Sequence, residues 1–220
     1  MATPEAPVGL WFFVVKGGLI MLPIIAGSIV AGGIVVERYW TLWRYRRRLV
    51  ELSGSLSAQV ESGKVTDALR ACQGQATPLG RLFTTALLHR SQERAELTRR
   101  LERPGAEVVA DLESYMGALA TIVGIEPLLG FLGTIVGMIK AFMEWERMGE
   151  TITINVLAGG IYEAMITTAA GLIIAIPYYL AYNHLVARVA MLTRLTEERT
   201  EALVDLLGHG GKRETILRAV

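Results

Sequence analysis

The sequence predicts an all-α membrane protein with three transmembrane helices, two of them extended into a cytoplasmic helical region. Two observations lead to this prediction. Hydrophobic residues make up 52% of the 220 residues, and they gather in three long stretches instead of spreading evenly along the chain. Each stretch has at least the ~20 residues that a helix needs to cross ~30 Å of hydrocarbon. A single soluble domain of this length is therefore excluded.

The stretches divide the chain into segments. In order, we expect a periplasmic or interfacial N-terminal segment, the first transmembrane helix, a cytoplasmic helical loop, the second transmembrane helix, a periplasmic loop, the third transmembrane helix, and a cytoplasmic helix with a short, Gly-rich, mobile tail. Their boundaries are 1–16, 17–37, 38–113, 114–142, 143–155, 156–185 and 186–220. The N-terminal segment, with its run Leu10-Trp11-Phe12-Phe13 before Lys16, suits a piece lying at the membrane interface.

The first apolar stretch, from Gly17 to Val36, contains no charged residue. The preceding residues Met1 to Leu10 contain no lysine or arginine, so the stretch is expected to be an uncleaved anchor and not a signal peptide. Basic residues follow it, which places its C-terminal end in the cytoplasm by the positive-inside rule. The basic anchor consists of Arg44, Arg46, Arg47 and Arg48, and Trp40 and Trp43 stand beside it as an aromatic belt.

The loop over 38–113 is too polar to lie in the membrane. Helical spacing of apolar residues predicts helices over 64–71 and 81–101, with a break at 77–80. A third helix is expected to begin after Pro104-Gly105 and to run straight into the second transmembrane helix.

The second and third stretches each contain one carboxylate. Glu126 is the only charged residue from Ser114 to Ile139, and Glu163 is the only carboxylate from Thr151 to Ala187. A charged side chain at the centre of a membrane helix costs roughly 2.5–3.5 kcal/mol even on forgiving scales, so such residues usually have a function. Threonines follow both carboxylates, namely Thr134 after Glu126, and Thr167 and Thr168 after Glu163. Together these polar groups suggest a path for an ion or a proton.

Small residues lie at helical spacing beside these polar groups. The packing candidates are Gly130, Gly133 and Gly137 in the second stretch, Gly171 and Ala175 in the third, and the two prolines Pro127 and Pro177. Small residues allow membrane helices to approach closely, and the stripes are equally compatible with packing faces alone. Counting from the turn, Thr134 and Thr168 lie about 15 and 18 Å deep. We expect them to face one another, with Glu163 nearer the outer side and Glu126 nearer the cytoplasm, level with Pro177.

Two long strings in these stretches resemble the MotA/TolQ/ExbB proton-channel family. They are Pro127-Leu-Leu-Gly-Phe-Leu-Gly-Thr-Ile-Val-Gly-Met138 and Gly160-Ile-Tyr-Glu-Ala-Met-Ile-Thr-Thr-Ala-Ala-Gly-Leu-Ile-Ile-Ala-Ile-Pro177, followed by Tyr182-Asn183. The stretch from Gly17 to Glu37-Arg38 is similar to the first helix of the ExbB branch. The resemblance covers nearly the whole chain.

The resemblance implies a homopentamer in the bacterial inner membrane that encloses the single-span helices of an ExbD-like partner. In the family, the essential proton-binding aspartate belongs to that partner. Thr134 and Thr168 match the pore-lining threonines, and Glu163 matches the glutamate of the third span. Proton flow would then pass work to a TonB-like transducer. We expect no catalytic residue, cofactor, metal or nucleic-acid partner, and the lipid bilayer as surroundings.

Glu126 departs from the family pattern, which has a small residue at that position. One hypothesis makes Glu126 a cytoplasmic-side proton relay or gate. The alternative is that it reaches the water of the cytoplasmic vestibule or pairs with a loop arginine. Lys140 is interpreted as a snorkelling residue near Met143 and Glu144.

Other functions compete with the ExbB-like interpretation. A TolQ-like subunit, or one serving gliding or secretion, is the alternative inside the family, whereas the flagellar MotA branch has a longer loop and four spans. From another class, a non-conducting membrane scaffold remains open. An intramembrane enzyme is disfavoured because the spans contain no paired aspartates and no serine–histidine arrangement. The three histidines are scattered, which disfavours a metal site, and lone Cys72 is expected to be a packed apolar residue in a reducing compartment.

Overall fold

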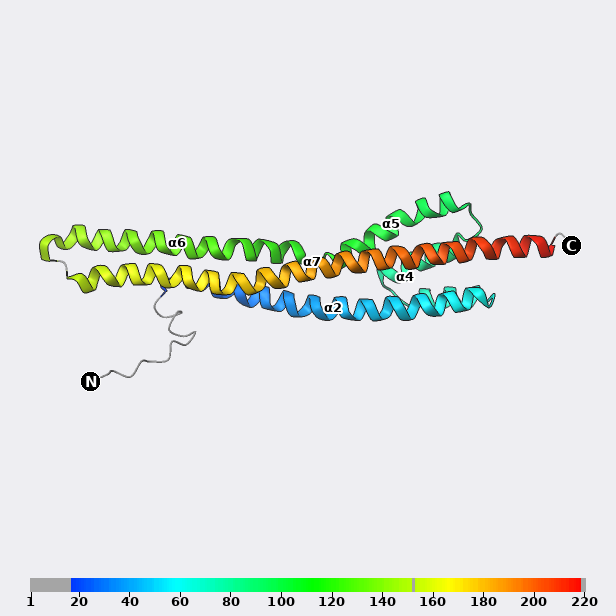
Figure 1. The fold of residues 1–220 in the computed structure, drawn as a ribbon, viewed down its shortest axis with the longest axis horizontal. Coiled ribbons are helices and arrows are strands. Elements are labelled where there is room, and N and C mark those ends of the chain that lie inside the picture. Colours follow the sequence, from blue (N-terminus) through cyan, green and yellow to red (C-terminus); the bar gives the residue numbers. More distant parts are fainter. Residues whose placement is uncertain (1–16, 152, 219–220) are drawn as a thin grey trace, which may run out of the picture. The chain divides into compact units, whose positions relative to one another are not determined.

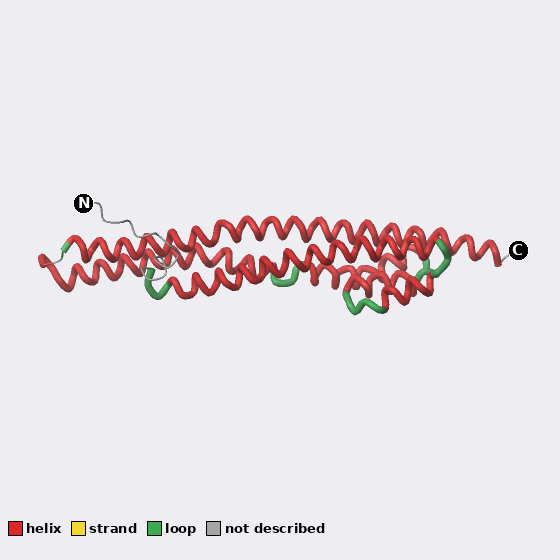
Figure 2. The backbone as a smooth tube through the Cα atoms, turned by 90° about the horizontal axis from the view of Figure 1, so that it is seen from below, coloured by secondary structure: helices red, strands yellow, loops and turns green. Residues whose placement is uncertain are grey.

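The computed structural model describes residues 17–151 and 153–218, without the side chains of residues 150 and 209–218. The expected interfacial segment 1–16 lies outside the described residues. Every regular element among the described residues is helical, which confirms the predicted all-α class (Figures 1 and 2). The elements are α2 (Met21–Glu61), α3 (Val65–Gln73), α4 (Pro78–Leu88), α5 (Arg94–Leu112), α6 (Met116–Met148), the short 3-10 helix η1 (Gly149–Thr151) and α7 (Ile154–Arg218).

Three helical stretches among the described residues are long and apolar enough to cross a membrane, one starting in α2, one ending in α6 and one in α7. Many large apolar side chains on these stretches are exposed, among them Ile29, Phe131 and Leu180. Such surfaces require lipid or other protein around them, because soluble chains rarely expose large contiguous apolar patches.

The chain forms two compact units, and α2 and α7 contribute to both. The first, which we call the membrane unit, contains the described residues 17–37 and 115–184. The second, which we call the loop unit, contains the described residues 38–114 and 185–218.

In the membrane unit, α6 and α7 run antiparallel and side by side on either side of η1 (Figure 1). The first turns of α2 pack on both helices. Met21 and Ile24 form a buried cluster with Ala170 of α7. Further along α2, the hydroxyl of Tyr178 donates a hydrogen bond to the carbonyl of Ser28, with 2.9 Å between the two oxygens.

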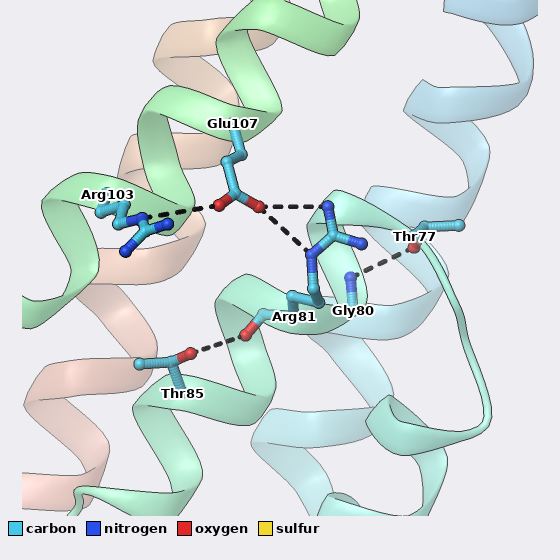
Figure 3. Close-up of polar contacts among 6 residues, drawn as sticks. All are labelled: Thr77, Gly80, Arg81, Thr85, Arg103 and Glu107. Atoms are coloured by element: carbon cyan, nitrogen blue, oxygen red, sulfur yellow. Dashed lines mark hydrogen bonds and ion pairs between the residues drawn. The ribbon is translucent and has the colours of Figure 1, made fainter.

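In the loop unit, α4 and α5 pack through apolar side chains that include Phe83 and Leu101, both buried. The Thr77 hydroxyl accepts a hydrogen bond from the Gly80 N–H at 3.2 Å and so caps the start of α4 (Figure 3). Arg81 of α4 pairs with Glu107 of α5 at 3.1 Å on the surface (Figure 3). The pair is exposed, so its contribution is at most about 1 kcal/mol and apolar burial holds the two helices together.

The loop helices differ in part from the prediction. The helix over 64–71 is confirmed as α3, but the single helix over 81–101 is wrong, since α4 ends at Leu88 and α5 begins at Arg94. Ser91 lies in the connection, and serine favours turns because its hydroxyl competes for nearby backbone hydrogen bonds. Pro104 lies inside α5 and does not start a helix. Burial of Leu101 and Val108 around it offsets its helix-breaking effect.

The helix also fails to run straight from α5 into α6. The last turn of α5 is held by Arg38 of α2, whose guanidinium donates to the Ser114 hydroxyl at 2.6 Å and to the Asp111 carbonyl at 3.3 Å. Tyr115 then adopts a left-handed backbone with φ of +62° before α6 starts. The contact with Asp111 satisfies a carbonyl group that a continuing helix would have used, so α2 stabilises the interruption.

The ends of the long helices also extend further than expected. α6 continues to Met148 and α7 begins at Ile154, so helix occupies much of the segment expected as a loop over 143–155. The backbone of α7 continues as helix through Gly208 to Arg218, the segment expected to be a short, Gly-rich, mobile tail.

Candidate functional site

Glycines on one face of α6 bring its backbone against α7. A Cβ atom added at Gly133 would collide with the side chain of Thr167. One added at Gly137 would lie 2.8 Å from the Cβ of Ala164, and one at Gly130 would lie 3.1 Å from the Cα of Thr168. Real Cβ atoms essentially never come within 3.0 Å of another atom, so Gly133 and Gly137 are required for the contact, and a side chain at Gly130 would be accommodated only if α7 moved slightly.

The α7 side of this contact sets the register between the helices. A Cβ atom at Gly171 would lie 2.8 Å from the backbone oxygen of Glu126, so Glu126 lies opposite Gly171 and not level with Pro177 as expected. Ala175 is buried, Pro127 is half-buried inside α6, and Pro177 is exposed inside α7.

The threonine hydroxyls all donate to backbone carbonyls. Thr168 donates across the helix pair to the Gly130 carbonyl at 2.8 Å. Thr134 donates to the Phe131 carbonyl of its own helix at 2.6 Å, and buried Thr167 donates to Ala164 at 2.8 Å. A hydroxyl has one proton to donate and two lone pairs to accept. Each of these oxygens therefore retains only accepting capacity, and none of these bonds joins Thr134 to Thr168.

Glu163 pairs with a lysine of the neighbouring helix. The Nζ of Lys140 lies 2.8 Å from Oε1 of Glu163, and both side chains are partly exposed. Lys140 therefore contacts α7. The sequence predicted a different position, with Lys140 snorkelling near Met143 and Glu144. The loop before α2 approaches the same carboxylate. A Cβ atom at Gly18, whose φ is +66°, would collide with Oε1 of Glu163.

Glu126 is almost completely buried, with 1% of its surface exposed. Neither carboxylate oxygen has a hydrogen-bond partner among the described residues. The expectation that Glu126 reaches vestibule water or pairs with a loop arginine is therefore wrong. Instead its side chain points toward Gly27 of α2, where an added Cβ atom would lie 3.1 Å from Oε1.

The basic anchor lies in the loop unit, on the part of α2 that follows the apolar stretch. The guanidinium of Arg44 stacks over the ring of Trp40 at 5.1 Å, and that of Arg47 over Trp43 at 4.8 Å. Arg46 and Arg48 are exposed beside them. Exposed tryptophans with stacked arginines suit a boundary between lipid and water, where the ring sits in the interface and the cation faces the headgroups.

Two other titratable groups of the loop unit are buried and unsuited to catalysis. Burial raises the pKa of Tyr45 to about 12 and that of the Cys72 thiol to about 11. The Tyr45 hydroxyl donates to Thr196 at 2.8 Å, since the Thr196 proton is already given to the Leu192 carbonyl. Among residues 17–151 and 153–218, no group of three or more metal-ligating side chains could hold a metal ion.

The sequence did not predict three contacts of the site: Gly27 lies beside Glu126, Lys140 pairs with Glu163, and Tyr178 bonds to Ser28. Lys140 offered a signal, because it is a cation one residue past an otherwise apolar stretch. Tyr178 offered a weaker one, as a hydroxyl-bearing residue well inside the third stretch. Nothing distinguished Gly27 from the other small residues of its helix.

Comparison with known proteins places the site within a described family. A profile of the MotA/TolQ/ExbB proton channel family matches residues 74–198, which include Glu126, Thr134, Glu163 and Thr168. The chain is 29% identical over 172 residues to the putative biopolymer transport protein ExbB-like 3 of Synechocystis sp., an alignment covering 76% of this chain and 80% of the relative. It is 30% identical over 181 residues to the biopolymer transport protein ExbB of Neisseria meningitidis, again covering 76% and 80%. It is 41% identical over 81 residues to the Tol-Pal system protein TolQ of Haemophilus influenzae, covering 37% and 35%.

Proposed function

This chain belongs to the MotA/TolQ/ExbB proton channel family, and we propose that it is the ExbB-like subunit of an inner-membrane motor driven by proton flow. It is a multi-pass membrane protein of a channel family and not an enzyme. In the proposal, its N-terminus is periplasmic and its C-terminus cytoplasmic. Five copies enclose the single-span helices of an ExbD-like partner, and the complex passes work to a TonB-like transducer for outer-membrane transport.

The hydrogen bond from Thr168 to the Gly130 carbonyl is the observation that carries this proposal. Because the threonine protons are committed to backbone carbonyls, the Thr134 and Thr168 oxygens can accept a hydrogen bond but have no proton to offer. A protonated carboxyl on a partner helix can donate to them, whereas an ionised carboxylate gains nothing from them. We call these two oxygens, of Thr134 and Thr168, the threonine collar. The collar favours the neutral form of the partner carboxyl, so the partner can carry a proton past it.

The exposed apolar surface of α6 supports assembly with further chains. Leu128, Phe131, Leu132, Ile135, Ile139 and Phe142 are all exposed along this helix. Lipid can cover such residues, but an oligomer buries them as well. In the proposed pentamer, part of this surface contacts neighbouring copies and part faces the enclosed partner.

A TolQ-like role is the second candidate, because the TolQ relative has the higher identity, 41% against 30%. That alignment covers only 37% of this chain, whereas the ExbB alignment covers 76%. We therefore favour the ExbB-like role, in which the transducer is of the TonB type.

Purification of the full chain from native membranes in a mild detergent tests the proposal. Native mass spectrometry should find five copies together with a small single-span protein that has an aspartate near the start of its span. A stable species with another copy number and no such partner would contradict it. Co-isolation of a Tol-type in place of a TonB-type transducer would select the second candidate.

A further inference from the structure

The carboxyl group of Glu126 occupies a closed junction of three helices in the membrane unit. Gly27 of α2 lies against its side chain, and Gly171 of α7 lies against its backbone. Ile122, one turn earlier on α6, approaches Gly27 from the same side. With 1% of its surface exposed, Glu126 contacts neither lipid nor the solvent around the unit.

Among the residues that the structure describes, no charged or donating group forms a hydrogen bond with this carboxylate. Both oxygens lack a hydrogen-bond partner among the described residues. The part of α2 that faces it has no charged residue up to Val36, and α6 has no other charged residue between Ser114 and Ile139. On α7 the nearest carboxylate in sequence is Glu163, eight residues before Gly171, and it is paired with Lys140. Tyr178, a titratable residue of α7 that contacts α2, donates its proton to the Ser28 carbonyl.

An ionised carboxylate in such a place would have the full desolvation free energy, because no described residue offsets it with a hydrogen bond or an opposite charge. A neutral carboxylic acid has a much smaller cost and fits the same space. The absence of a partner therefore points to a group that holds a proton.

We propose that Glu126 is a proton-binding site inside the protomer, at the junction of α2, α6 and α7, separate from the threonine collar. Loss of this proton to water leaves a carboxylate directly against Gly27. The charged form then favours separation of α2 from the α6–α7 pair, which would let water or a cation reach it. Proton occupancy of Glu126 thus couples to the packing of α2. The proposal assumes the channel function, but its test does not use transport.

Infrared spectroscopy of the purified complex tests protonation directly. In an ester-free detergent at neutral pH, the wild-type complex should show C=O absorption of protonated carboxylic acids, and Glu126→Gln should lower it by the contribution of one carboxyl per copy of this chain, while the proposed partner carboxyl keeps its own contribution. Glu163→Gln is the matched control and should retain the full absorption, because Glu163 is ion-paired. An identical spectrum for wild type and Glu126→Gln would overturn the proposal.

A second pair of variants tests the location without removing the carboxyl. A Cβ atom at Gly27 would press on Oε1 of Glu126, whereas one at Gly33 on the same helix meets nothing within 4 Å. Gly27→Ala should shift the frequency of the carboxylic-acid band, and Gly33→Ala should leave it in place. Equal spectra for both variants would contradict the placement against α2. If the band behaves as expected but the complex conducts no protons, the channel function fails and this inference stands.

Discussion

The hydroxyl of Thr168 donates a hydrogen bond to the backbone carbonyl of Gly130 on the neighbouring helix, with 2.8 Å between the two oxygens. This bond can form because Gly130 has no side chain, so the α7 backbone comes within van der Waals contact of α6. The same glycine thus provides both the close approach and the acceptor. The bond fixes the direction of the Thr168 lone pairs, which are the groups available to a partner carboxyl.

Replacing Thr168 by valine should preserve folding and assembly. The variant has nearly the same shape and loses one hydrogen bond, which lowers stability by about 1 kcal/mol. Thr168→Ser should lose less. Size-exclusion chromatography and thermal unfolding of the detergent-solubilised complex measure this. Dissociation of the Thr168→Val complex would show that the residue is structural and not part of a conduction path.

A side chain at Gly137 should disrupt the α6–α7 contact. Its Cβ would lie 2.8 Å from that of Ala164 and 3.1 Å from the Ala164 backbone nitrogen, so Gly137→Val must push the helices apart. Overpacking of this kind costs about 1–3 kcal/mol. Gly124→Val on the same helix is the control, since nothing lies within 4 Å of its Cβ position. Thermal unfolding should show a lower midpoint for Gly137→Val only, and equal midpoints would refute the predicted contact.

Reversing the charges of the Lys140–Glu163 pair should show coupling between the helices. Lys140→Glu and Glu163→Lys each place like charges 2.8 Å apart in the present geometry, and the double variant restores attraction. Because both groups are partly exposed, we expect a coupling energy of about 0.5–1 kcal/mol from a double-mutant cycle of unfolding. The same reversal at Glu144 and Arg147, within one helix, should change α6–α7 packing little. Strict additivity at Lys140 and Glu163 would contradict the pair.

Cys72 should be unreactive in the folded protein. Its thiol is buried, and burial raises the pKa of the group to about 11, so the nucleophilic thiolate is scarce at neutral pH and increases only as the pH approaches that value. Maleimide labelling followed by mass spectrometry should be slow for the native chain and fast after denaturation. Ser91→Cys in a Cys72→Ala background, at an exposed site of the same unit, should label rapidly. Fast labelling of native Cys72 would contradict the packing of α3.

Much of this fold could be predicted because it depends on short-range features of the chain. Membrane-length apolar stretches follow from residue type and length alone, and the glycine spacing on α6 follows from helix periodicity. The ion pair between Glu163 and Lys140 could not be predicted from the sequence, because it depends on which residue of α6 lies opposite Glu163. The register was estimated from the turn, which placed Glu126 level with Pro177, whereas the structure places the Glu126 backbone against Gly171.

The features that escaped prediction involve residues far apart in sequence. The break between α5 and α6 depends on Arg38, which is separated from Ser114 by 76 residues. The burial of Glu126 depends on Gly27, a residue of a different helix. Local propensity contains no information about such contacts, and without them Glu126 was equally compatible with a water-exposed position.

Proton flux into liposomes that contain the complex of this chain with its single-span partner tests the central claim most directly. Under an imposed membrane potential, wild type, Thr168→Ser and the control Thr121→Val should conduct; the Thr121 hydroxyl is exposed and bonds only its own helix, to Gly117. Thr168→Val should assemble and lose the flux, because it removes the oxygen that accepts from the partner carboxyl. A Thr168→Val complex that conducts as well as wild type would contradict the account.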